Sequence, residues 1–175
     1  ALSVGEVLSA VPLVLALKER YPGIPLVFTA ATVQGLSVAR KALEGKADRI
    51  LRMPLDTWWA MHRLVDRIRP ALFVVVEGDL WPGLLNLLAK RHIPSLLVNG
   101  RISPRTYSGY RRHRHLVRSL LFGALERCLM QTEVDRERLL SIGLPPSKVV
   151  TAGNLKFECE WVPMADEERG RMLES

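Results

Sequence analysis

The first candidate for chemistry is the carboxylate of Glu6, in the sequence Ser3-Val4-Gly5-Glu6. Ser-x-x-Glu ahead of an apolar run is the signature of a capping box, in which serine and glutamate bond each other's backbone N–H groups. Gly5 is unusual there, because glycine is a poor helix former unless backbone or ligand must approach closely. Glu6 therefore has two interpretations, a helix cap or a carboxylate presented to a substrate, and the local sequence favours the cap.

A second pair of acidic side chains lies in Glu77-Gly78-Asp79-Leu80-Trp81-Pro82, directly after a run of valines. Asp79 suits the cap of a following helix, with Pro82 in its first turn and Trp81 in the core. That interpretation leaves Glu77 unexplained. A carboxylate at the end of a strand is a candidate for hydrogen bonds to sugar hydroxyls or for proton transfer, so both interpretations stay open.

A candidate anion-binding side chain, Arg101, follows the turn signal Asn99-Gly100 and precedes Ser103-Pro104, which is typical of a helix start. The turn itself does not require an arginine. A guanidinium suits bidentate contact with phosphate or carboxylate. A structural ion pair with Glu77 is an equally good alternative.

Basic and aromatic residues suggest contact surfaces. The segment 105–118, RTYSGYRRHRHLVR, is strongly basic in a chain of net charge +7. It predicts a solvated helix face, contact with anionic phospholipid, or nucleic-acid binding, and the lack of any known nucleic-acid-binding motif argues against the last. Trp58 and Trp59 are adjacent, so only one can fully face the core of a helix and the other is a candidate interfacial side chain.

These residues must be positioned by alternating strands and helices. The expected strands are 25–30, 49–53, 71–76, 95–98, 127–131 and 149–152. The expected helices are 7–20, 34–43, 57–68, 80–91, 116–125 and 133–142. Because the strands are continuous apolar runs, the pattern predicts an α/β fold, a Rossmann-like parallel sheet with helices on both faces. Ligands bind beyond the carboxyl ends of such strands, where Glu77, Asn99 and Asn154 are expected.

Composition limits the other possibilities. No stretch approaches the roughly 18 apolar residues of a membrane span, and the histidines and the cysteines Cys128 and Cys159 lack metal-ligand spacing. The chain opens on a helix signal, so we expect the first strand of the domain to be missing. The charged end, residues 159–175, is expected to be a linker or the start of an inter-domain segment.

Four segments in order, SVGE, VEGDLWP, NGRIS and GNLKFE, resemble the N-terminal domain of the bacterial 3-deoxy-D-manno-octulosonic acid (Kdo) transferases. The resemblance runs from Ala1 to about Glu158 and implies the acceptor-side, N-terminal half of a GT-B glycosyltransferase. It implies transfer of Kdo from CMP-Kdo to a lipid A precursor in lipopolysaccharide core assembly. The donor would bind mainly through an absent C-terminal domain, no metal or other cofactor is expected, and the 175-residue chain alone is expected to be inactive.

The resemblance also implies roles for individual residues. Glu6 matches the family's general base, which a sugar hydroxyl needs because it is a poor nucleophile until its proton is removed. Gly5 would then let the acceptor approach the backbone. Asn154 and Lys156 fall near the inter-domain cleft, and Asp79 stands where the family usually has a second glutamate. The residues expected to bind the acceptor are Ser3, Gly5, Glu77, Asp79, Asn99 and Arg101.

Location and competing functions follow from the same reasoning. The resemblance implies the cytoplasmic face of the inner membrane, with peripheral attachment or an N-terminal anchor outside this chain, and an anionic membrane surface rather than nucleic acid as partner. Two alternatives stay open from the sequence. One is another GT-B-like or nucleotide-sugar enzyme, such as a sugar epimerase. The other is a non-catalytic Rossmann-like module that binds an anionic partner through residues 105–118.

Overall fold

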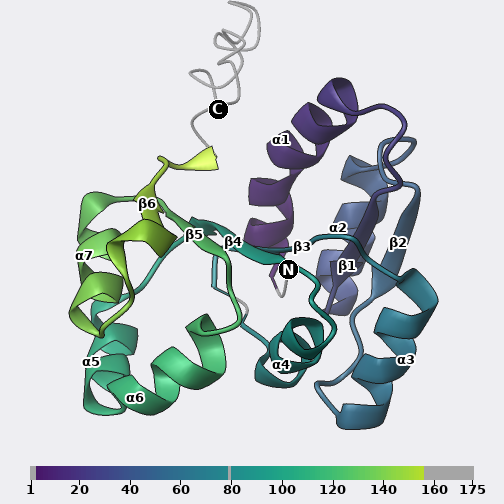
Figure 1. The fold of residues 1–175 in the computed structure, drawn as a ribbon. Coiled ribbons are helices and arrows are strands. Elements are labelled where there is room, and N and C mark those ends of the chain that lie inside the picture. The colour runs from purple at the N-terminus through teal and green to yellow at the C-terminus, as the bar shows by residue number, and fades with distance from the viewer. Residues whose placement is uncertain (1–2, 79, 156–175) are drawn as a thin grey trace, which may run out of the picture.

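The structure is a computed structural model that describes residues 3–78 and 80–155, and Figure 1 shows its fold. The strands are β1 (Val27–Ala30), β2 (Arg49–Arg52), β3 (Phe73–Val76), β4 (Ser95–Gly100), β5 (Arg127–Met130) and β6 (Val149–Thr151). The longer helices are α1 (Val4–Arg20), α2 (Val33–Ala42), α3 (Trp58–Ile68), α4 (Pro82–Lys90), α5 (Pro104–Arg112) and α7 (Glu133–Ser141). The short helical turns are α6 (Arg114–Val117), η1 (Arg118–Phe122) and η2 (Pro146–Lys148).

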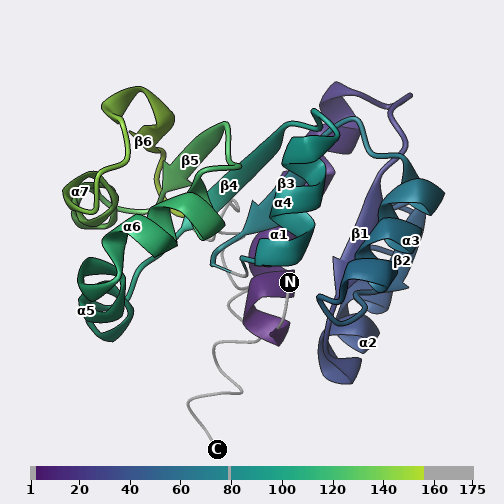
Figure 2. The same cartoon turned by 60° about the horizontal axis from the view of Figure 1, so that its bottom comes forward.

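All strand pairs are parallel, as the continuous apolar runs predicted. Within the described residues the strands form two groups, β1-β2 and β3-β4-β5-β6. Helices α1 and α2 contact each other, and α3 contacts α4 on the other side of the sheet (Figure 2). The prediction of a Rossmann-like parallel sheet covered on both faces is therefore confirmed.

One apolar cluster joins the two groups of strands. Val7, Ala10 and Val14 of α1 pack with Phe28 of β1, and Val76 of β3 packs against the same cluster. Helix α1 therefore lies across both β1 and β3, with its N-terminus at the carboxyl end of β3. This places Ser3 and Glu6 beside the residues that follow β3.

The helix ends are fixed by polar side chains, and one cap differs from the sequence interpretation. Ser3 and Glu6 form both hydrogen bonds of the capping box on α1. The N–H groups of Gly83 and Leu84, at the start of α4, donate to the carboxylate of Asp56 over 2.8 and 2.9 Å. The sequence offered Asp79 for this cap, but the carboxylate comes from the loop between β2 and α3. Asp79 itself lies outside the described residues.

The basic segment is more helical than expected. Ser103 caps α5 by accepting the N–H of Thr106, and the helix runs to Arg112. A short helix and a π-helical turn follow, up to Phe122, where a helix over 116–125 was expected. The prolonged helical region brings Thr106 and Tyr110 into position over the end of β4.

Candidate active site

A cavity of about 470 Å³ opens at the carboxyl ends of β3 and β4. Its polar wall includes Glu6 from the first turn of α1, Glu77 from the end of β3, and Arg101 from the end of β4. The other lining residues are Gly78, Leu80, Leu97, Ile102, Ser103, Thr106, Tyr110 and Phe122. The structure thus brings three separately predicted site residues together at the edge where parallel sheets bind ligands.

Glu6 both caps α1 and lines the cavity. The backbone N–H of Ser3 donates to Glu6 Oε2 over 3.1 Å, and the N–H of Glu6 donates to Ser3 Oγ over 3.2 Å. A helix N-terminus favours negative charge, because its first N–H groups point at the carboxylate. The two interpretations of this stretch are therefore compatible, since the cap orients the same side chain that the cavity exposes to a ligand.

Glu77 has an unusual backbone conformation. Its φ angle is +66°, in the left-handed region, which costs a non-glycine residue roughly 1–2 kcal/mol. Ser9 Oγ, fully buried in α1, lies 2.6 Å from Glu77 Oε1 and 2.8 Å from the carbonyl oxygen of Gly5. Strained residues cluster at functional sites, and here Ser9 links the turn that carries Glu6 to the carboxylate of Glu77.

The loop that carries Arg101 is held by a buried carboxylate. The N–H of Ile102 donates to Asp135 Oδ1 over 2.9 Å, and Asp135 is 5% exposed. Arg138 Nη1 donates to the carbonyl oxygen of Ile102 over 2.5 Å. Both polar groups of this residue are thus bound by α7, which fixes the direction of the neighbouring Arg101 and Ser103 into the cavity.

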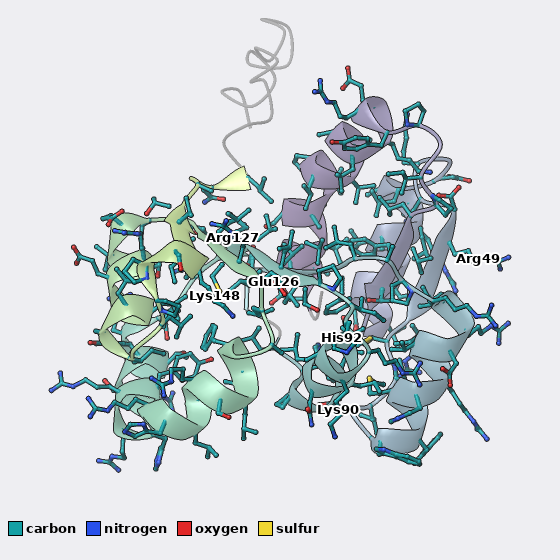
Figure 3. All side chains as sticks on the ribbon, in the orientation of Figure 1. Arg49, Lys90, His92, Glu126, Arg127 and Lys148 are labelled. Atoms are coloured by element: carbon teal, nitrogen blue, oxygen red, sulfur yellow. The ribbon has the colours of Figure 1, made fainter. Side chains whose placement is uncertain are left out.

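The charges at the two edges of the sheet differ in their partners. Arg127 and Lys148, labelled in Figure 3, lie at the amino ends of β5 and β6 and donate to backbone carbonyls. Arg101, at the carboxyl edge, lines the cavity, and its backbone N–H donates to the carbonyl oxygen of Glu77 over 3.3 Å. Among the described residues no salt bridge joins Arg101 to Glu77, and Arg101 lines the cavity together with Glu6 and Glu77.

The remaining predicted site residues lie around the cavity. Asn99 is 2% exposed at φ +56°, and its Oδ1 accepts the N–H of Leu155 over 3.2 Å. This bond connects the end of β4 to the segment after β6, at the residue that follows Asn154. Asn99 is not among the residues that line the cavity. A Cβ at Gly5 would meet only Ser3 Oγ at 3.8 Å, so packing does not require this glycine. Asp79 and Lys156 lie outside the described residues.

Several site residues were missed in the sequence. Tyr110 packs edge-on against Phe122, with ring centroids 5.8 Å apart, and forms an aromatic wall of the cavity. Burial raises the pKa of the Tyr110 hydroxyl. In the sequence, a tyrosine within a basic segment suggested only a contact surface. Thr106 and Asp135 could have been found from the capping patterns at the starts of α5 and α7. Ser9 gave no signal beyond a polar residue on an apolar helix face.

Other kinds of catalytic site find no support in the described part of the chain. Residues 3–78 and 80–155 contain no group of three histidine, cysteine or acidic side chains placed to hold a metal. Burial raises the pKa of the Cys128 thiol to about 12, so this cysteine is unsuited to act as a nucleophile. No helix within the described residues combines the length and apolarity that crossing a bilayer requires.

Known proteins resemble both the sequence and the fold. The Kdo transferase of Haemophilus influenzae is 33% identical over 159 residues, covering 90% of this chain and 36% of that protein. A bifunctional glycosyltransferase/methyltransferase of Fusobacterium nucleatum is 32% identical over 133 residues, covering 76% of this chain and 21% of that protein. The chain thus spans about a third or less of the length of these relatives.

Solved structures share the fold at low sequence identity. The Neisseria meningitidis UDP-GlcNAc 2-epimerase bound to UDP-GlcNAc matches with a TM-score of 0.61 at 18% identity, covering 87% of this chain and 45% of that one. The Staphylococcus aureus MnaA–UDP co-structure gives a TM-score of 0.66 at 17% identity, covering 87% and 43%. At this identity the likeness shows the fold alone. The matched region makes up somewhat less than half of each larger protein.

The family assignment rests on nearly the whole chain. A family model described as 3-deoxy-D-manno-octulosonic-acid transferase (kdotransferase) matches residues 1–159. That range contains all four segments on which the resemblance was based, and it agrees with the identity to the Haemophilus influenzae transferase. The chain therefore belongs to the 3-deoxy-D-manno-octulosonic acid transferase family.

Proposed function

We propose that this chain is the acceptor-side domain of a glycosyltransferase that moves Kdo from CMP-Kdo to a lipid A precursor. The observation that carries the proposal is the cavity that joins Glu6 of the SVGE segment to Glu77 and Arg101, in a chain of the Kdo transferase family. The cavity also has apolar and aromatic walls, Leu80, Tyr110 and Phe122. An amphiphilic sugar acceptor fits this combination of carboxylates, a guanidinium and apolar surface.

The proposed reaction forms one bond and breaks one. The acceptor hydroxyl oxygen attacks the anomeric carbon of Kdo while Glu6 takes the hydroxyl proton. The bond from that carbon to the phosphate oxygen breaks, and CMP leaves with its electron pair. Glu77 accepts hydrogen bonds from other acceptor hydroxyls, and Arg101 pairs with an acceptor phosphate. Holding both reactants in this geometry is the main contribution of the protein.

The proposed domain organisation assigns residues 1–158 to this acceptor-side domain and 159–175 to a linker or inter-domain segment. Asn154 and Lys156 would lie at the cleft toward a donor-binding domain. Among the described residues β1 pairs only with β2 and β3 only with β4. We propose that a parallel strand from the longer protein, leading into α1, fits between β1 and β3 and completes the sheet.

The direct test is an assay of the full-length protein with CMP-Kdo and a lipid A precursor. We expect the full-length protein to transfer Kdo and the 175-residue chain to be inactive with the same substrates, because the donor would have no binding domain. Chain binding to the acceptor without turnover would agree with the proposal. A full-length protein that transfers no Kdo would refute the proposed function. Transfer by the 175-residue chain would refute the proposal that acceptor and donor bind to two separate domains.

We also propose a peripheral location at the cytoplasmic face of the inner membrane, supported by the basic segment. Arg111 and Arg112 of α5 and Arg114 of α6 are all exposed. Each basic side chain near an anionic bilayer contributes about 1 kcal/mol, decaying over a Debye length. These side chains are therefore placed to attract anionic lipid headgroups.

The prediction concerns the double variant Arg111→Gln/Arg112→Gln. This variant should bind vesicles containing phosphatidylglycerol about 30-fold more weakly than the wild type at low salt, the ratio that corresponds to about 2 kcal/mol of lost binding free energy. The difference between the two proteins should shrink as the salt concentration rises. Vesicle sedimentation measures this. Arg40→Gln/Lys41→Gln on α2, also exposed, is the control with the same charge change. Equal binding by the two double variants would identify the basic segment as an ordinary solvated face.

A further inference from the structure

An exposed apolar corner lies between β2 and α3. The exposed fractions are 78% for Leu55, 77% for Trp58 and 59% for Trp59. The core of this region does not need them, because Ala60, Met61, Val65 and other buried side chains already pack α3 against α4. Large aromatic side chains left in water forgo a substantial gain from burial. A cluster of this kind on a protein surface indicates a contact with something else.

Hydrogen bonds connect the corner to the first turn of α4, near the cavity. Asp56, between Leu55 and the tryptophans, accepts hydrogen bonds from the N–H groups of Gly83 and Leu84 in the first turn of α4. A Cβ at Gly83 would come within 2.6 Å of Asp56 Oδ1, so the fit is close. The same turn follows Leu80, which lines the cavity, and Figure 1 shows α3 beside α4. The corner and the cavity therefore share one edge of the domain.

The charges around the corner are positive. The guanidinium carbon of Arg63 lies 5.7 Å from the centre of the Trp59 ring, and Arg52 is exposed at the end of β2. Asp56 lies within the corner, and its carboxylate is engaged by α4. The flanking acidic residues Asp48 and Asp66 pair with Lys18 and Arg91. The corner thus combines apolar and indole surface with cations, and its complement is an apolar partner that carries negative charge.

We propose that Leu55, Trp58 and Trp59 insert into the headgroup–acyl boundary of an anionic phospholipid bilayer, with Arg52 and Arg63 at the phosphates. Tryptophan prefers this boundary because its ring is apolar and its N–H is polar. Single-stranded nucleic acid is the other class of partner that tryptophan and arginine bind. The bilayer is favoured because Leu55, the most exposed of the three, offers no flat face for a base. The inference goes beyond the proposed reaction, and it directs the cavity mouth toward the membrane.

The test uses the 175-residue chain and vesicles of phosphatidylethanolamine and phosphatidylglycerol, with and without acyl chains brominated near the glycerol. No donor or acceptor is present, so the result does not depend on the transferase function. Tryptophan emission should shift to the blue on binding and be quenched by the brominated lipid. Trp58→Ser/Trp59→Ser should lose that quenching and bind about 100-fold more weakly, about tenfold for each side chain removed from the bilayer.

The matched control is Val33→Ser/Val134→Ser, which changes two apolar side chains of α2 and α7 that are 64% and 54% exposed. Its binding and quenching should equal those of the wild type, and circular dichroism should show all three proteins folded with similar melting temperatures. Wild-type protein without quenching, or a tryptophan variant that binds and is quenched like the wild type, would refute the proposal. Tight binding of a single-stranded oligonucleotide without vesicle binding would assign the corner to nucleic acid instead.

Discussion

Glu6→Gln in the full-length protein is expected to lower kcat by about 100- to 10,000-fold, the usual effect of losing a general base. The melting temperature should hardly change. Glutamine still accepts the N–H of Ser3 and so completes the capping box, which in this structure uses Glu6 Oε2 at 3.1 Å. What the amide cannot do is take a proton from the acceptor hydroxyl. The two roles of this side chain are therefore separable by one substitution.

The measurement is a steady-state assay with CMP-Kdo and the acceptor, together with thermal unfolding and CMP-Kdo binding. Donor binding should persist, because the proposal places the donor mainly in a second domain. Glu19→Gln, at an exposed acid near the other end of α1, is the matched control and should retain full activity. A Glu6→Gln enzyme with more than about a tenth of wild-type turnover, far above the range for a lost base, would reduce Glu6 to a cap.

Glu77 is expected to give the second-largest effect. Glu77→Gln and Glu77→Gly should each lower kcat/KM for the acceptor by about 10- to 100-fold, as expected for losing a hydrogen bond to a charged group. Most of the change should be in KM, because the proposed role is acceptor binding. The physical basis is the position of this carboxylate in the cavity wall, braced by Ser9 Oγ at 2.6 Å.

Stability distinguishes this role from a structural one. Glycine relieves the cost of φ +66° at Glu77, roughly 1–2 kcal/mol, but loses about 0.5–1 kcal/mol of chain entropy and the bond from Ser9. The Glu77→Gly protein should therefore melt close to the wild type while binding the acceptor poorly. Glu126→Gln, at an exposed acid on the opposite edge of the sheet (Figure 3), is the control. A destabilised Glu77→Gly protein with unchanged acceptor KM would make Glu77 a structural residue.

Much of the local structure could be predicted from the sequence. The run FVVV of β3 is short, apolar and rich in β-branched valine, which favours a strand over a helix. The capping box at Ser3 and Glu6 connects residues three apart, so the spacing alone predicts it. The parallel sheet followed from continuous apolar strands alternating with helices, and its carboxyl edge predicted that Glu77 and Arg101 would meet.

The tertiary structure decided which side chains complete the site. Ser9 reaches Glu77 across 68 positions of sequence, Asp56 caps α4 from 27 positions away, and Asp135 holds Ile102 across 33. Asn99, predicted to bind the acceptor, accepts a hydrogen bond from the backbone of Leu155, 56 positions away. Periodicity and capping patterns report only neighbours within a few residues, because they arise from the repeat of one helix or strand. Which distant polar group satisfies which backbone or carboxylate depends on how the elements pack, and only the folded chain determines that.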